Sequence, residues 1–138
     1  MKKKKVMIVD DEQDFLYLTK LNLERTGQYS VLTLLSAQDI VAQVHSFKPD
    51  IILLDILMPR IGGMEVCKIL NNDPVGQKVP IVILSALDKD IDKLQAYQAG
   101  VIDFLVKPIE KAELIARVEK ALSLNEMESA DEEENIDY

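Results

Sequence analysis

The sequence is short of cysteine and of long apolar runs, and both shortages restrict what the protein can be. Cys67 is the only cysteine, so no internal disulfide can form. No apolar run approaches the roughly 18 residues that a membrane-spanning helix needs. The lysines after Met1 precede only the short apolar stretch Val6–Val9, which is not typical of a secretory signal. We therefore expect a cytoplasmic protein that does not contact membranes.

Positive charge is absent from one end of the chain, and the net charge of −8 is concentrated there. Residues 125–138 hold seven acids and no base, which leaves 17 acids against 16 bases, or about −1, for residues 1–124. This body has no basic stripe that would bind nucleic acid directly. Its length suits one domain, and the end has no apolar periodicity. We therefore expect a single domain over 1–124 and a disordered acidic tail or linker over 125–138.

Short apolar runs alternate with amphipathic stretches, and the alternation repeats five times. The runs predict strands at Val6–Val9, Tyr29–Leu35, Ile51–Leu54, Ile81–Leu84 and Val101–Val106. The amphipathic stretches predict helices at about Glu12–Arg25, Ala37–Phe47, Gly63–Asn72, Lys89–Ala99 and Lys111–Leu124. Ser36 is expected to cap the second helix, His45 to be a partly exposed helix residue, and Cys67 to be a small core residue. Five βα units predict an α/β fold of the flavodoxin-like (βα)₅ type, a doubly wound parallel sheet in strand order 2-1-3-4-5.

Charged and polar residues follow four of the expected strands. Asp10 and Asp11 follow the first strand, Asp55 the third, Ser85 the fourth and Lys107 the fifth. In an open parallel sheet, the functional site lies beyond the carboxyl ends of the strands, beside the point where the strand order reverses. Any one of these residues, taken alone, has an ordinary structural interpretation as a helix cap or a surface charge. Five of them at one edge of one sheet indicate a site.

This combination favours phosphoryl transfer to a carboxylate with the help of Mg²⁺. Three carboxylates in one cleft repel one another, and Lys107 can offset only one of them. The oxygen-only ligand set suits Mg²⁺ better than Ca²⁺ or zinc. A carboxylate can act as a nucleophile, while cations and hydroxyl groups position the phosphoryl oxygens. We therefore predict that Asp55 is the phosphoacceptor, that Asp11 binds the metal directly and Asp10 partly through water, and that Lys107 and Ser85 bind phosphoryl oxygens.

Taken together, these residues make the chain resemble the receiver domain of bacterial two-component response regulators. Within that family it is similar to the chemotaxis response regulator. The matching motifs run in order over residues 5–124 and form a highly specific set. They are Val9-Asp10-Asp11-Glu12, Pro49 to Asp55, Met58-Pro59 with Gly63, Pro80 to Ala86, Ala99-Gly100, Asp103-Phe104 and Val106-Lys107-Pro108.

The resemblance implies a phosphorylation switch that acts by protein–protein contact, and not an enzyme with a substrate of its own. A sensor histidine kinase or a histidine phosphotransfer protein would donate the phosphoryl group from a phosphohistidine. Ser85 would then move toward the phosphate, and Phe104 would turn inward. The face formed by the fourth helix, fifth strand and fifth helix would change and control a downstream protein target. The resemblance further implies a cis peptide bond between Lys107 and Pro108 and metal ligation by Asp55 itself and by the backbone carbonyl of Leu57.

Several alternatives stay open. Leu57 and Leu87, two residues after Asp55 and Ser85, offer no polar group to orient a water, so we expect a long-lived phosphoryl group. A Mg²⁺-dependent phosphohydrolase with an aspartyl-phosphate intermediate typically needs a second acid at the position of Leu57, which argues against that enzyme. Other interpretations are a scaffold that is never phosphorylated and the N-terminal receiver of a longer transcriptional regulator. The protein would be a monomer or a phosphorylation-dependent homodimer.

Overall fold

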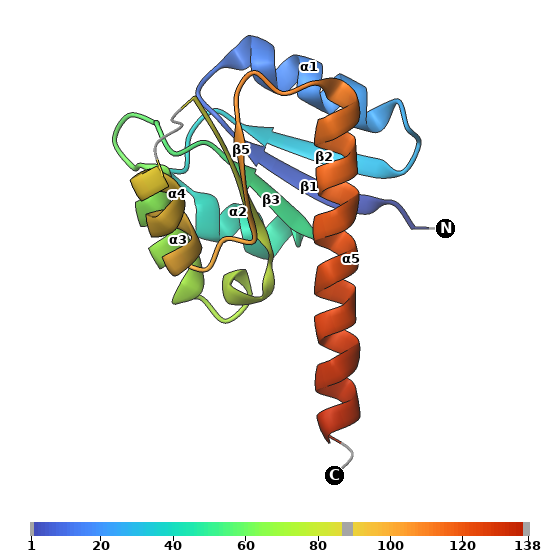
Figure 1. Cartoon of the computed structure of the whole chain (residues 1–138). Coiled ribbons are helices and arrows are strands. Elements are labelled where there is room, and N and C mark those ends of the chain that lie inside the picture. The colour runs from blue at the N-terminus through green and yellow to red at the C-terminus, as the bar shows by residue number, and fades with distance from the viewer. Residues whose placement is uncertain (1, 87–89, 137–138) are drawn as a thin grey trace.

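Helices and strands alternate along the chain in the computed structural model, which describes residues 2–86 and 90–136 (Figure 1). The strands are β1 (Lys4–Val9), β2 (Tyr29–Leu34), β3 (Ile51–Leu54), β4 (Ile81–Ser85) and β5 (Asp103–Val106). The α-helices are α1 (Gln13–Glu24), α2 (Ile40–Phe47), α3 (Gly63–Asn71), α4 (Asp90–Gln98) and α5 (Lys111–Ile136). A single turn of 3₁₀ helix, η1 (Gly76–Lys78), precedes β4.

The strands form one parallel sheet in the order β2-β1-β3-β4-β5, which confirms the predicted topology. Each crossover contains a helix, as a parallel connection requires. The order reverses between β1 and β3, where Val9 lies opposite Leu54 at the carboxyl ends of the two strands. The residues that follow Val9 and Leu54 therefore lie at the switch point of the sheet.

Helices cover both faces of the sheet, and the central strands are buried on both. Because successive side chains of a strand point to opposite faces, Val6 and Ile8 of β1 pack in one core cluster and Met7 and Val9 in another. The first cluster includes α1 and α5, and the second includes α2, α3 and α4. Figure 1 shows the same two layers around the sheet. The continuous apolar runs of β1 and β3 are thus explained by burial on two sides.

The start of α2 differs from the prediction. The helix begins at Ile40 and not at Ala37, and Asp39 before it makes no capping hydrogen bond through its side chain. Ser36 therefore does not cap this helix. Ala37 is buried in the second core cluster although it precedes the helix. Its apolar side chain matched the helical pattern, and for this reason the predicted helix began too early.

Helix α5 continues past residue 124, where we expected the ordered body to end, and reaches Ile136. Its backbone is therefore helical over most of the segment predicted to be disordered. Glutamate, alanine and methionine favour helix, and the packed first half of α5 supplies the nucleus from which a helix extends. The division into a body over 1–124 and a separate tail stays a prediction. Although α5 has 26 residues, neither it nor another helix in the described ranges is long and apolar enough to cross a membrane.

Candidate functional site

The backbone holds the predicted site residues at the switch point by continuing the strand ladders for one more step. The N–H of Asp10 donates to the carbonyl oxygen of Leu34 at 3.0 Å, and the N–H of Asp55 donates to that of Val9 at 3.0 Å. Adjacent strands of a sheet lie about 4.8 Å apart. The side chains that leave β1 and β3 at this height are therefore neighbours.

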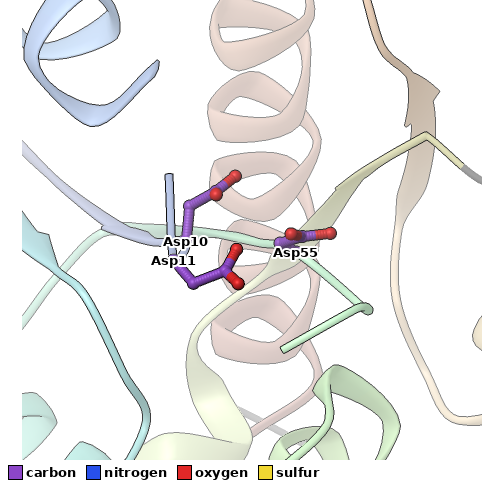
Figure 2. A group of neighbouring side chains, drawn as sticks. All are labelled: Asp10, Asp11 and Asp55. Carbon is purple, nitrogen blue, oxygen red and sulfur yellow. The ribbon is translucent and has the colours of Figure 1, made fainter. Parts of the chain in front are cut away.

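The carboxylates of Asp10, Asp11 and Asp55 form one cluster (Figure 2). One oxygen from each lies within 4.8 Å of the other two. Asp10 and Asp55 are 1% and 5% exposed, whereas Asp11 is exposed. In Figure 2 the side chains of Asp10 and Asp11 extend from the end of β1 toward the side on which Asp55 lies. Three carboxylates whose oxygens lie this close together form a donor set for a hard cation such as Mg²⁺.

Lys107, just after β5, places its ammonium group against the same acids. Its Nζ lies 2.6 Å from Oδ2 of Asp10, 3.5 Å from Oε1 of Glu12 and 3.9 Å from Oδ2 of Asp55. The ammonium also lies 4.2 Å from the centre of the Phe15 ring, in a cation–π contact. Asp10 is therefore paired directly, while Asp55 has only a more distant positive charge.

Burial raises the pKa of the Asp55 carboxyl from 3.8 to about 6. The positive charge of Lys107 lowers that pKa in part, and the negative charges of Asp10 and Asp11 raise it further. Burial also disfavours the charge of Lys107, but its hydrogen bond to Asp10 and the attraction of the acids raise the pKa of Lys107 overall. Three carboxyl groups therefore face one ammonium group at this site.

The loop after Asp55 fixes the orientation of its carboxylate. The N–H of Leu57 donates to Oδ1 of Asp55 at 3.2 Å. The N–H of Gly63 donates to the carbonyl oxygen of Ile56 at 2.9 Å, which brings the start of α3 against the Asp55 backbone. A Cβ at position 63 would lie 2.6 Å from the carbonyl oxygen of Asp55. Glycine is therefore required there by close backbone approach.

The remaining predicted site residues lie on or beside β4 and β5. Ser85 is fully buried, and its carbonyl oxygen accepts a hydrogen bond from the N–H of Lys107 at 2.8 Å. Phe104 is 7% exposed and packs in the core cluster of α2, α3 and α4, so its ring is already buried. The peptide bond between Lys107 and Pro108 is cis. Leu87 lies outside the described residues.

Some contacts of the site were not predicted from the sequence. Glu12 and Phe15 both contact Lys107, and their only signal was their position in the first turn after β1, at the edge where a site was expected. His45 is exposed as predicted, but its Nε2 lies 2.9 Å from the carboxylate of Asp73, a contact that the sequence did not indicate. Cys67 is fully buried and burial raises its pKa to about 11, which confirms a core residue.

A family model and a curated relative match almost the whole body of the chain. The family model is that of the response regulator receiver domain, and it matches residues 6–119. The relative is the alkaline phosphatase synthesis transcriptional regulatory protein PhoP of Bacillus subtilis (strain 168), which is 36% identical over 124 residues. The match covers 90% of this chain and 50% of that protein, so the chain spans half the length of this relative.

Two solved structures have the same fold. A protein described as a response regulator, from Chloroflexus aurantiacus J-10-fl, is 32% identical with a TM-score of 0.82, and the match covers 88% of this chain and 99% of that one. The BeF3-activated N-terminal receiver domain of RstA from Klebsiella pneumoniae is 28% identical with a TM-score of 0.79, and the match covers 86% of this chain and 98% of that one.

Proposed function

The chain belongs to the response regulator receiver domain family of two-component signalling, and from this premise we propose that Asp55 accepts a phosphoryl group from a phosphohistidine of a partner protein. One observation carries the proposal. The oxygens of Asp10, Asp11 and Asp55 lie within 4.8 Å of one another, and the ammonium of Lys107 lies 3.9 Å from Asp55. A nucleophilic carboxylate, a cation-binding group and a fixed positive charge therefore share one small volume.

The residues of the site fit Mg²⁺. The pKa of buried Asp55 is raised to about 6, so further positive charge beside it would be favourable. Asp11 and Asp55 would bind the ion directly, together with the carbonyl oxygen of Leu57. Asp10 would bind partly through water, because one of its oxygens already lies 2.6 Å from Lys107. When bound, the ion would neutralise negative charge on the acceptor and on the phosphoryl oxygens.

In the transfer step, an oxygen of the Asp55 carboxylate attacks phosphorus in line with the P–N bond of the phosphohistidine. A P–O bond forms, the P–N bond breaks, and the imidazole nitrogen leaves with the electron pair. Lys107 would bind one oxygen of the transferred group, and the hydroxyl of Ser85 would bind another after a local rearrangement. The N–H of Leu57 holds one oxygen of Asp55, at 3.2 Å, and so limits rotation of the nucleophile.

The switch would act through the surface formed by α4, β5 and α5. Movement of Ser85 toward the phosphate changes the end of β4, and Phe104 on β5 adjusts to it. Leu94 and Tyr97 of α4 are 52% and 48% exposed, which gives this surface apolar groups for a downstream protein target. The donor would be a sensor histidine kinase or a histidine phosphotransfer protein. We place both proteins in the cytoplasm, where unpaired cysteines such as Cys67 stay reduced.

Intact mass measurement tests the acceptor directly. The protein is treated with a small acyl-phosphate donor and Mg²⁺, and we expect one added phosphoryl group. Asp55→Asn should gain none, while Asp14→Asn, the same chemical change at an exposed residue of α1, should be labelled like the unaltered protein. Labelling of Asp55→Asn to the same extent, or no labelling of the unaltered protein, would contradict the proposal.

We further propose that the phosphoryl group is long-lived. The side chain of Leu57 is 54% exposed beside the acceptor and has no polar atom to orient an attacking water. The label on the purified protein should therefore decay slowly, and introducing a polar side chain by Leu57→Asn should accelerate the loss. Rapid loss of label from the unaltered protein would contradict this expectation.

A role as the N-terminal receiver of a longer transcriptional regulator is a second candidate. It is favoured because the chain spans 50% of the Bacillus subtilis relative, whose name describes a transcriptional regulatory protein. In that case the target of the α4, β5 and α5 surface would be a domain of the same polypeptide. Extension of the natural open reading frame beyond residue 138 into a second domain would favour this candidate over a stand-alone switch.

A further inference from the structure

The ammonium group of Lys107 is held by an aromatic ring as well as by acids. Its Nζ lies 2.6 Å from Oδ2 of Asp10 and 3.5 Å from Oε1 of Glu12. It also stands over the ring of Phe15, 4.2 Å from the ring centre. The side chain of Lys107 is only 12% exposed. The ammonium has therefore lost most of its surrounding water, and these contacts decide where it lies.

The first turn of α1 places the ring of Phe15 at the site. The helix begins at Gln13, and the N–H of Leu16 donates to the carbonyl oxygen of Glu12 at 3.1 Å. Residues three apart on a helix share a face, so Glu12 and Phe15 both reach Lys107. The ring is half-buried and packs against the core cluster that includes α1 and α5. This packing holds the ring in place beneath the ammonium.

The ring differs from the neighbouring acids because it carries no net charge. Asp10 is also a proposed ligand of the metal ion, and any carboxylate repels the negatively charged oxygens of a phosphoryl group. The ring of Phe15 attracts a cation through the negative face of its π system. An ammonium group has three N–H donors, and the ring occupies only one side of it. The ring can therefore hold Lys107 during the transfer without opposing the incoming group.

The distance between Lys107 and the acceptor makes this position matter. The Nζ of Lys107 lies 3.9 Å from Oδ2 of Asp55, so the ammonium is near the acceptor without a hydrogen bond to it. Lysine has a flexible four-carbon stem. A group misplaced by about 1 Å can slow a reaction by about 100-fold. A contact that keeps the stem from turning toward solvent therefore contributes to the rate.

We propose that Phe15 is a positioning residue for phosphoryl transfer, whose ring holds the ammonium of Lys107 beside Asp55 by a cation–π contact. The inference rests on the proposed function, because it takes Lys107 to bind an oxygen of the transferred group. What the site requires at position 15 is an aromatic face and not only apolar volume. Tyrosine meets this requirement, and leucine does not.

The test compares rates of labelling by a small acyl-phosphate donor with Mg²⁺, followed by intact mass. Phe15→Leu should slow labelling about tenfold, which corresponds to about 1.4 kcal/mol. Phe15→Tyr keeps the ring and should be labelled at nearly the unaltered rate. The matched control is Phe47→Leu, the same change at a half-buried ring of α2 that lies 5.6 Å from the Nζ of Lys5, at the amino ends of the strands. This control should be labelled like the unaltered protein.

Fluorinated phenylalanines at position 15 separate the charge of the ring face from packing. Fluorine withdraws electrons from the face and weakens its attraction for a cation, while the shape and apolar contacts of the ring stay nearly the same. The logarithm of the labelling rate should therefore fall steadily as fluorine atoms are added. Equal rates across this series would overturn the proposal, because the ring would then act through its volume alone.

Proton NMR without any phosphodonor gives a readout that does not depend on labelling. Protons over the face of an aromatic ring are shifted upfield, so the ε-methylene of Lys107 should be shifted in the unaltered protein and in Phe15→Tyr. In Phe15→Leu it should return to the ordinary lysine position. An ε-methylene signal that is the same in Phe15→Leu would overturn the proposal, because the ring would then not contact Lys107.

The labelling results also separate this inference from the proposed function. Labelling of Phe15→Leu at the unaltered rate would overturn the role of Phe15 and leave Asp55 as the acceptor. Absence of labelling from the unaltered protein would overturn the proposed function, and the role of Phe15 in transfer with it. Equal slowing of Phe15→Leu and Phe15→Tyr would overturn the role of the aromatic face, because tyrosine retains that face.

Discussion

The two edges of the sheet differ in how far their charged side chains are exposed to water. At the carboxyl edge, Lys107 and Asp10 form an ion pair whose side chains are 12% and 1% exposed. At the amino edge, Lys4 and Glu126 form an ion pair whose side chains are 47% and 61% exposed. Water screens the second pair and is largely removed from the first, so equal charges have unequal energetic consequences. The comparison teaches that burial, and not the number of charges, marks the functional edge.

The carboxyl edge also has unbalanced charge in a confined space. Asp55 keeps a pKa of about 6 because burial and two neighbouring acids outweigh the attraction of Lys107. At the amino edge, Lys4, Lys48 and Lys78 are exposed to solvent and line one cavity together with the acids Asp50 and Glu126. Unbalanced charge is therefore confined in a buried site at one edge, whereas the charges at the other edge are exposed to water.

Removal of Lys107 should have the largest effect on stability. Lys107→Met leaves the buried carboxylate of Asp10 without the ammonium at 2.6 Å, and breaking a buried pair in this way costs about 3–5 kcal/mol. We expect that loss in the free energy of unfolding, measured by urea denaturation at pH 7 in the presence of a chelator. Mg²⁺ should recover part of the loss by taking the place of the ammonium. A loss below about 1 kcal/mol would mean that this edge behaves like a solvated surface.

The next largest effect should come from Gly63→Ala. The added Cβ would meet the Asp55 carbonyl oxygen at 2.6 Å and the Cα of Ile56 at 2.7 Å, and both are backbone atoms. Overpacking against backbone costs roughly 2–3 kcal/mol, and the displaced loop should also slow labelling of Asp55. Gly27→Ala, near the amino edge, is the control. It has open space but a φ of +76°, so only backbone strain of about 1 kcal/mol is expected.

Asp55→Asn should stabilise the protein when no divalent cation is bound. The folded pKa of about 6 lies above the ordinary 3.8, so the native state binds more protons between these values and loses stability as pH rises through that window. Above pH 6 the full cost is present, roughly 1–3 kcal/mol for a shift of about 2 units. Asparagine removes that cost, so the variant should unfold at higher urea concentration at pH 7 and match the unaltered protein near pH 4. Mg²⁺ should narrow the difference.

Replacement of Asp73, in the loop between α3 and β4 near the amino edge, should change the stability in the opposite direction. Hydrogen bonds from the N–H of Gly76 and from His45 lower its pKa. A lowered folded pKa contributes stability that is present above the ordinary value of 3.8 and lost as pH falls through the folded pKa. Asp73→Asn should therefore destabilise the protein at pH 7, with a difference that disappears in acid. If Asp73→Asn were instead more stable than the unaltered protein at pH 7, the two aspartates would not differ in their effect on stability, and this prediction would be wrong.

The sequence predicted the fold and the location of the site because both depend on local patterns. Apolar runs such as Ile51–Leu54 are buried on both faces of a parallel sheet, and their periodicity indicates this without a structure. Asp10, Asp55 and Lys107 were predicted together because strand order alone brings strand ends to one edge. The phosphoryl role and the ligand role of each residue remain predictions.

The contacts that depend on side-chain direction could not be predicted in this way. Phe15 of α1 lies against Lys107, which follows β5, and His45 of α2 lies against Asp73, which follows α3. Both contacts depend on how these elements pack in three dimensions, which the sequence pattern does not specify. The continuation of α5 to Ile136 was missed for another reason. Acid-rich composition predicts disorder, whereas the packed helix that precedes it favours continued helix, and a composition argument does not include that neighbour.

The smallest effect should come from Lys4→Met, and it completes the comparison. Its partner Glu126 is 61% exposed, so water replaces the ammonium when it is removed. A pair of this kind contributes about 0.2–0.5 kcal/mol, and salt abolishes the contribution. The variant should be compared with the unaltered protein by urea denaturation at low ionic strength. If Lys4→Met cost as much as Lys107→Met, exposure would not explain the difference between the edges, and the argument that burial marks the functional edge would have no basis.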